Sequence, residues 1–422
     1  MMSKPDYYTV AYLADHEIPE IFDTGKHLIY SSPATLAFNS PGAQGFGVKR
    51  AGLSIPGSVM LIVSPGCCGR NTSAITVNDV YKNRYFYYLM DETDIITGRH
   101  LPKIKEAVKE IVDFLDQKPS VVMICITCVD ALLGTDMERV SRECEAYAHV
   151  KVRPCYMYAL TREGRRPPMV HVRESLYSLL ESLPKDVHTV NLLGYFAPLN
   201  DDCELYDYLH KMGLTTINEL SRMESYDAFL EMAHANFNLI LHPEARAAAK
   251  DLRERLNIGD IELTRFYTID FIHRQYQAFA HALGSSIDDT KDYQTLKERI
   301  EQAHYHARLA IGETCNLDPI EAALALSLYG FNVKEIYCTI NDNQKQYLNM
   351  LKKISPETKV YCNNEPTMLY YDNEAEDLDF TIGKDAAFYH PDLPNIPFNE
   401  DVQPFGYQGV SLLLDRIEEV LS

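Results

Sequence analysis

Short apolar runs rich in Val, Ile and Leu recur along the chain and alternate with longer amphipathic segments. Each run is nearly continuous in apolar character, which is typical of strands that are covered on both faces in a parallel sheet. On this pattern we predict strands over 58–63, 120–126, 187–193, 237–241, 307–311 and 333–337.

The segments between these runs repeat apolar residues at helical spacing. In 101–115, Ile104, Val108 and Ile111 fall on one face. Pro243 stands where a helix begins and Gly330 where one ends. We predict helices over 101–115, 244–256, 285–306, 319–328 and 410–421. Strands that alternate with helices indicate an α/β fold with parallel sheets.

The repeating pattern divides into three blocks, which we interpret as three α/β domains. The first, 1–185, ends in the Pro- and Arg-rich stretch TREGRRPP and one helix. The second, 186–305, starts at the strand near Val187. The third, 306–422, contains a loop-rich segment and the final helix.

Charge and composition exclude several classes of partner. The net charge of −20 would repel a polyanion, so we expect no nucleic-acid partner. The sequence has no apolar run of 18 residues or more and no basic segment followed by an apolar run at its start. We therefore expect a cytoplasmic protein that does not contact a membrane. Disulfides are rare in such a compartment, so the ten cysteines need another explanation.

Cys67 and Cys68 follow the predicted strand 58–63 in the turn SPGCCG. In parallel α/β sheets, ligands bind at the carboxyl ends of the strands. Thiolates are also stabilised there by the N-terminus of the following helix. The alternative is a pair of buried cysteines at a tight turn.

Cys125 and Cys128 stand at the end of the predicted strand 120–126, at a spacing that lets both thiolates reach one metal or cluster. In the alternative, Cys125 packs in the core and only Cys128 has a chemical role. A zinc ion could be held by the four cysteines 67, 68, 125 and 128. An iron–sulfur cluster tolerates adjacent cysteines better because its thiolates are more widely separated.

Six segments resemble, in order, the nitrogenase component 1 type of oxidoreductase. The loop SPGCCGRNTS resembles the family's G-C loop, and ITCVDALLGTDMERV resembles its second cysteine segment. The others are DETDIITGRHLPKIKEAV, VNLLGYFAPLNDDCELYDYLHKMGL, NLILHPEARAAAKDLRERLNI and PFGYQGVSLLLDRI. The resemblance implies three Rossmann-like domains with cluster cysteines at Cys68 and Cys128.

The resemblance also implies an iron–sulfur cluster at the interface with a homologous subunit, in a dimer or an α2β2-type tetramer. Three cysteines from each side suit an eight-iron cluster of the P-cluster type, and two suit a four-iron cubane. Cys67, Cys68 and Cys128 permit either count. Gly69 and Thr127 are then neighbours of the sulfur atoms, and an ATP-dependent iron–sulfur reductase is the electron donor.

Two departures from the family pattern narrow the expected function. The stretch LAFNSPGAQGFGV lacks the further cluster cysteine that many members carry. Pro243 follows His242 at the position where the nitrogenase catalytic subunit has the cysteine that anchors its metal cofactor. We therefore expect a nitrogenase-like reductase subunit and not dinitrogenase itself. His171 and His242 are catalytic candidates, and the alternative for each is a structural role.

Two other functions stay open on the sequence. One is a scaffold on which a nitrogenase-type metal cofactor is assembled, because such proteins share the same cluster loops. The other is a zinc-stabilised α/β protein that binds a small ligand. Iron with labile sulfide would support the reductase or the scaffold, and zinc without sulfide would support the third function.

Overall fold

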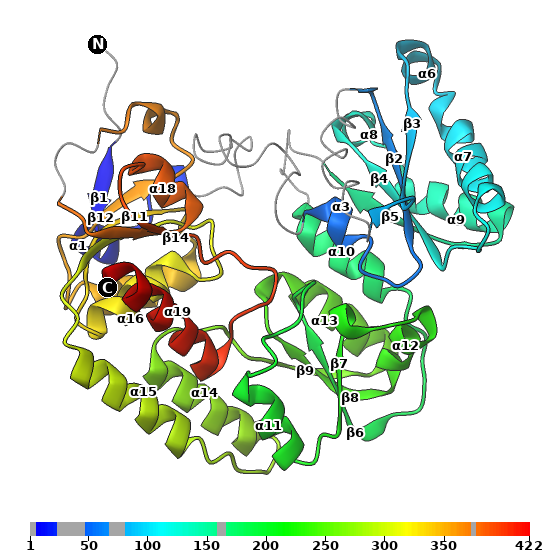
Figure 1. Ribbon diagram of the computed structural model, residues 1–422. Coiled ribbons are helices and arrows are strands. Elements are labelled where there is room, and N and C mark those ends of the chain that lie inside the picture. Colours follow the sequence, from blue (N-terminus) through cyan, green and yellow to red (C-terminus); the bar gives the residue numbers. More distant parts are fainter. Residues whose placement is uncertain (1–5, 23–46, 67–80, 158–165, 373–376) are drawn as a thin grey trace. The chain divides into compact units, whose positions relative to one another are not determined.

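The computed structural model describes residues 6–22, 47–66, 81–157, 166–372 and 377–422. The chain folds into two compact units. One consists of 1–38, 199–213 and 263–422, and the other of 39–198 and 214–262. Three sheets occur in the described ranges, two in the second unit and one in the first. The predicted α/β fold with parallel sheets is confirmed (Figure 1).

The first sheet has the strand order β3-β2-β4-β5, and all its pairings are parallel. Its strands are β2 (Val59–Ser64), β3 (Tyr85–Leu89), β4 (Val121–Ile126) and β5 (Lys151–Tyr156). Helices α7 (His100–Phe114) and α9 (Met137–Ala148) share one core with one face of the sheet. Helices α3 (Val48–Ala51) and α10 (Pro168–Tyr177) pack on the other face.

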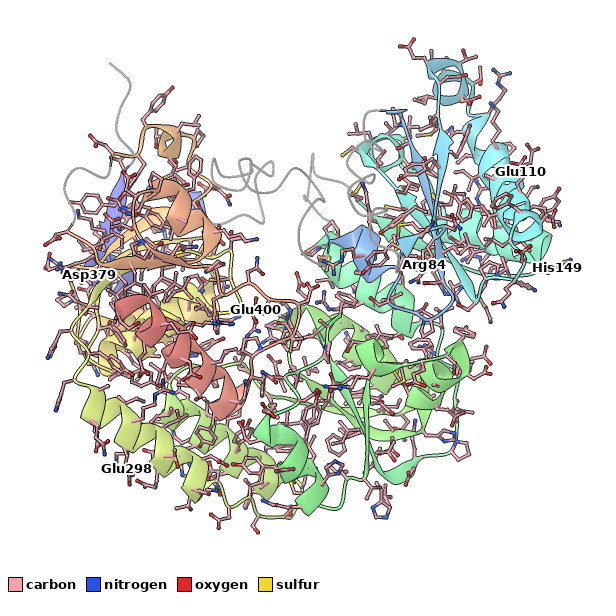
Figure 2. All side chains as sticks on the ribbon, in the orientation of Figure 1. Arg84, Glu110, His149, Glu298, Asp379 and Glu400 are labelled. Carbon is pink, nitrogen blue, oxygen red and sulfur yellow. The ribbon has the colours of Figure 1, made fainter. Side chains whose placement is uncertain are left out.

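Arg84 fixes the turn that leads into the central strand β2. Its guanidinium donates to the carbonyl of Leu53 at 2.7 Å and to the carbonyl of Ser58 at 2.9 Å. Figure 2 labels this side chain among those of the second unit. Because Arg84 directly precedes β3, these bonds join the starts of two neighbouring strands.

The second sheet has the order β7-β6-β8-β9 and is also parallel. It contains β6 (Asp186–Leu193), β7 (Thr216–Glu219), β8 (Ala235–Ile240) and β9 (Gly259–Glu262). Helix α13 (Arg246–Leu256) follows a short turn at Pro243 and buries its Ala- and Leu-rich face. The chain runs from β6 to β7 on one side and then to β8 on the other.

The third sheet belongs to the first unit and has the order β1-β12-β11-β10-β13-β14. It contains β10 (Arg308–Ile311), β11 (Asn332–Cys338), β12 (Lys359–Cys362), β13 (Phe380–Ile382) and β14 (Asn395–Ile396). The edge strand β1 (Tyr7–Thr9) pairs antiparallel with β12. Residues 7–9 therefore lie in the third sheet, although the sequence places 1–185 in one domain. The apolar helix α16 (Pro319–Leu328) is buried except at its last residue, Leu328.

The helices of the same unit include α11 (Glu204–Lys211), α14 (Ile269–Ala282), α15 (Thr290–Ala303) and α19 (Gly406–Leu421). Glu204 caps the start of α19, because its carboxylate accepts from the backbone N–H groups of Tyr407 at 2.7 Å and Gln408 at 3.1 Å. The phenol of Tyr276 donates to the same carboxylate at 2.8 Å. These bonds join the start of α11 to α14 and to the start of α19.

Glu321 of α16 is a buried carboxyl group from which we expect a pH-dependent contribution to the stability of this unit. Its carboxylate accepts from the backbone N–H groups of Tyr267 and Thr268, both at 2.9 Å, and burial raises its pKa from 4.5 to about 7. A group whose pKa is higher in the folded state stabilises the fold below its unfolded pKa, and that contribution is lost as the pH rises through the folded value. We expect wild-type stability to fall by up to about 3 kcal/mol between pH 4.5 and 7, relative to Glu321→Gln.

The measurement is urea denaturation of both proteins across this pH range. The difference between the two curves isolates Glu321, since the other titrating groups are common to both. Parallel curves would contradict the raised pKa.

Candidate functional site

The carboxyl ends of β2 and β4 meet at one edge of the first sheet. These strands are neighbours and run parallel, with Val63 opposite Ile126. Cys128 comes two residues after Ile126, and Cys67 and Cys68 come three and four residues after Ser64. Cys67, Cys68 and the predicted cluster neighbour Gly69 lie outside the described residues. The described carboxyl ends of these two strands, one before each cysteine segment in the sequence, are adjacent and in register.

Cys128 is the first residue of α8 (Cys128–Leu133) and is partly buried. Thr127 is the N-cap residue and keeps an extended backbone, so the chain turns directly from strand to helix at the cysteine. In parallel α/β sheets, ligands bind at the carboxyl ends of the strands, which is where this cysteine stands. The position suits a metal-binding thiolate.

Cys125 is in a different environment from Cys128. It lies within β4 opposite Cys155 of β5, and both side chains are 0% exposed. Met60, Cys125 and Cys155 belong to the same apolar core. This position agrees with the alternative in which Cys125 packs in the core and only Cys128 has a chemical role. The assignment of Cys125 as a ligand stays a prediction without structural support.

A buried His–Asp pair lies behind the Cys128 turn. Nε2 of His100, at the start of α7, is 3.1 Å from Oδ1 of Asp130 in the first turn of α8. Thr135 donates to the same oxygen at 3.0 Å. These two bonds tie the first turn of α8 to the start of α7 and to Thr135. The sequence did not reveal this pair, because its members are 30 residues apart.

His171, one of the two catalytic candidates, lies in α10. Its ring packs against Tyr156 with the centroids 4.6 Å apart, and Nδ1 is 3.9 Å from a carboxylate oxygen of Glu174. Burial lowers the pKa of His171, and the nearby Glu174 offsets only part of this effect. A neutral imidazole is therefore favoured at this position.

His242, the second candidate, follows β8 next to the end of β6. It is the N-cap of a short turn, where Nδ1 accepts from the backbone N–H of Glu244 at 3.3 Å. A side chain at Gly194 would meet the Cβ of His242 at 2.7 Å, so glycine is required there. The buried Arg173 donates to the carbonyl of Gly194 and, at 2.8 Å, to Glu244. These contacts give His242 a defined structural position.

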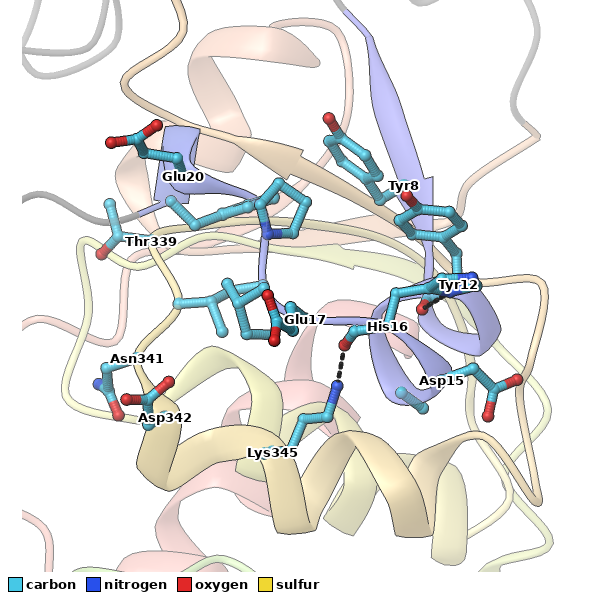
Figure 3. Close-up of a pocket in the computed structure, with 15 residues that line it drawn as sticks. Tyr8, Tyr12, Asp15, His16, Glu17, Glu20, Thr339, Asn341, Asp342 and Lys345 are labelled. Carbon is cyan, nitrogen blue, oxygen red and sulfur yellow. Dashed lines mark hydrogen bonds between the residues drawn. The ribbon is translucent and has the colours of Figure 1, made fainter.

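A separate cavity of about 1320 Å³ lies in the first unit between the N-terminal segment and the loop after β11 (Figure 3). Tyr8, Tyr12, His16 and Lys345 are among its lining residues. Lys345 donates to the backbone carbonyls of Leu13 and His16 and so closes the end of α1 (Val10–Asp15). None of the predicted site residues that the structure describes lines this cavity.

The chemistry at the edge of the first sheet fits an iron–sulfur cluster. A thiol stands at the strand end, and two buried hydroxyls beside it, Ser64 Oγ and Thr127 Oγ1, have no hydrogen-bond partner in the described ranges. Cysteine thiolates bind the iron atoms of such clusters, and neighbouring hydrogen-bond donors can bond to the sulfur atoms. Among the residues that the structure describes, no group of three or more His, Cys, Asp or Glu side chains could hold a metal ion. Further ligands must then come from residues outside the described ranges or from a second chain.

Comparison with known proteins places this arrangement in a family. The sequence model of the nitrogenase component 1 type oxidoreductases matches residues 43–422. The chain belongs to this family.

Individual relatives are distant. The nitrogenase molybdenum-iron protein alpha chain of Methanosarcina barkeri is 26% identical over 36% of this chain and 29% of its own length. The cofactor biosynthesis protein NifE of Clostridium pasteurianum is 23% identical over 49% of this chain and 45% of its own. NifE of Klebsiella pneumoniae is 25% identical over 56% of this chain and 55% of its own. The chain thus spans about a third to a half of the curated relatives that it matches.

The solved structure titled "Nitrogenase Cp1 at pH 6.5" has the same fold. It superposes with a TM-score of 0.70 at 16% sequence identity and covers 94% of this chain and 93% of its own. The predicted resemblance and the predicted fold class are therefore confirmed. No helix in the described ranges is both long and apolar enough to span a membrane.

Proposed function

We propose that this chain is a subunit of a nitrogenase-like reductase that holds an iron–sulfur cluster through Cys128 and Cys68, with Cys67 as a further ligand. The observation that supports the proposal most directly is the register of β2 and β4: the strand that precedes Cys67 and Cys68 in the sequence ends beside the strand that precedes Cys128. Family membership supports the same assignment. A second, homologous subunit would supply the remaining thiolates across a shared interface.

The residues of this chain have distinct tasks in the proposal. Cys128 supplies a thiolate at the start of α8, and the His100–Asp130 pair keeps that turn in place. The buried hydroxyls of Ser64 and Thr127 lie at the same edge. A bound cluster would supply one-electron transfer at low potential. We propose that the electrons come from an ATP-dependent iron–sulfur reductase and pass to a substrate or cofactor. His171 and His242 are the candidates to face that substrate.

A second candidate function is a scaffold for assembly of a nitrogenase-type cofactor. It is favoured by the two NifE relatives, whose identities of 23% and 25% are similar to the 26% of the alpha chain. A scaffold would use the same cysteines to bind the cluster. It would transfer its assembled cofactor in a single stoichiometric step and would not turn over a substrate repeatedly.

The experiment is an anaerobic purification followed by counts of iron, labile sulfide and zinc, with identification of subunits that co-purify. The reductase expects iron with sulfide and, on addition of an ATP-dependent iron–sulfur reductase, repeated turnover of an electron acceptor. A single stoichiometric transfer of cofactor would favour the scaffold. Zinc without sulfide would overturn both functions.

A further inference from the structure

Ser64 and Thr127 each follow the last residue that pairs β2 with β4 in the first sheet. Val63 and Ile126 are the last paired residues of β2 and β4, and Ser64 and Thr127 each come next along the chain. Thr127 has φ −108° and ψ −169°, so its backbone continues the extended conformation of the strand. The two residues therefore lie next to each other across the pair of strands.

Both side chains point to the same face of the sheet. Side chains alternate along a strand. Ile62 and Cys125, two positions earlier, pack in the core that contains α3 and α10, whereas Val63 and Ile126 pack in the core on the opposite face. Ser64 and Thr127 thus extend the face that carries Ile62 and Cys125.

The two hydroxyls are buried without an acceptor in the part of the chain that the structure describes. Ser64 is 0% exposed and Thr127 is 1% exposed, and neither Oγ atom has a hydrogen-bond partner there. Threonine at an N-cap ordinarily bonds to an N–H of the first turn, but Thr127 makes no such bond. A buried hydroxyl without a partner costs free energy, so two in adjacent positions point to a missing acceptor that both can reach.

We infer that this acceptor is sulfur of the iron–sulfur cluster, and that Ser64 and Thr127 set its reduction potential. The inference rests on the proposed function, since it requires the cluster held by Cys128. Sulfide and thiolate sulfurs accept hydrogen bonds, and Thr127 directly precedes the ligand. Donors to these sulfurs stabilise the reduced, more negative state and so raise the potential.

The test uses the anaerobically purified holoprotein and four variants. Ser64→Ala and Thr127→Val each remove one hydroxyl, and Thr127→Ser keeps it. Ser141→Ala is the matched control: Ser141 is also a buried hydroxyl without a partner in the described ranges, but it lies on α9. The midpoint potential is measured by a redox titration that is followed by electron paramagnetic resonance. Iron, sulfide and thermal unfolding are measured on the same samples.

We expect a more negative midpoint potential in Ser64→Ala and Thr127→Val, with a larger shift in the double variant. Thr127→Ser and Ser141→Ala should keep the wild-type potential. Unchanged potentials at full iron content would overturn the inference and leave the proposed function standing. A shift in Ser141→Ala as large as the others would also overturn it, because the effect would then be non-specific. A wild-type protein without iron and sulfide would instead refute the proposed function.

Discussion

Cys128→Ala is expected to lose essentially all bound iron and sulfide and to reduce electron transfer to background. The thiol stands at the first position of α8, at the end of β4 and beside the end of β2. A methyl group cannot replace a thiolate in the coordination of iron, and the first turn offers no other sulfur. The measurement is iron and sulfide per chain after anaerobic purification, together with the visible and electron paramagnetic resonance spectra.

Two other cysteines of the same unit provide controls for this result. Cys144 of α9 is fully buried, and burial raises its thiol pKa to about 12, so Cys144→Ala should keep the cluster. Cys125→Ala should also keep it, because Cys125 packs against the core residues Met60 and Cys155. Each control removes one buried atom and costs about 1 kcal/mol of stability. Full iron retention in Cys128→Ala, or iron loss in all three variants, would contradict the assigned ligand.

The strands and helices that were predicted correctly have strong local signals. The apolar run predicted over 120–126 is β4 (Val121–Ile126), and the helix predicted over 319–328 is α16 (Pro319–Leu328). In both cases continuous burial selects a continuous apolar sequence, so the residues themselves report the environment.

The strands that were missed lack this signal for physical reasons. β5 contains Pro154, which argues against a strand, but β5 is at the edge of its sheet, where a missing N–H costs little. β3 (Tyr85–Leu89) is also an edge strand, half exposed and rich in tyrosine rather than Val and Ile. β1 pairs with β12, with Tyr7 opposite Tyr361, and a local sequence pattern cannot predict pairing with a strand so distant in the sequence.

Some features of the candidate site could be predicted from the sequence, and others depend on the packing of distant segments. The position of Cys128 at a strand end follows from the apolar run before it, which the sequence displays. The contact of His100 with Asp130 depends on how α7 and α8 pack, and the placement of Ser64 near Thr127 depends on the register of β2 and β4. Such contacts between distant residues arise only once the sheet is assembled. Ser64 in particular reads in the sequence as an ordinary residue before a Pro-Gly turn.

Gly406→Ala is expected to destabilise the first unit by about 4 kcal/mol or more. Gly406 begins α19 with φ +60°, a conformation that costs an L-residue about 1–2 kcal/mol. A Cβ there would lie 1.9 Å from Oε1 of Glu204 and 2.3 Å from the phenol oxygen of Tyr276. The carboxylate would have to leave the N–H groups of Tyr407 and Gln408, which adds the cost of a lost buried cap to that of overpacking.

Gly284→Ala separates the steric effect from the backbone effect in the same unit. Gly284 has φ +65°, but a Cβ there would meet no atom within 4 Å. This control should therefore lose only the backbone contribution, about 1–2 kcal/mol. The free energy of unfolding is obtained from urea denaturation of both variants and the wild type. The two glycines have nearly the same φ. The difference in free energy of unfolding between the variants therefore measures the steric cost of a Cβ atom next to Glu204 and Tyr276. Equal decreases in the free energy of unfolding of the two variants would contradict this prediction, because they would show that displacing Glu204 from the start of α19 does not destabilise the protein.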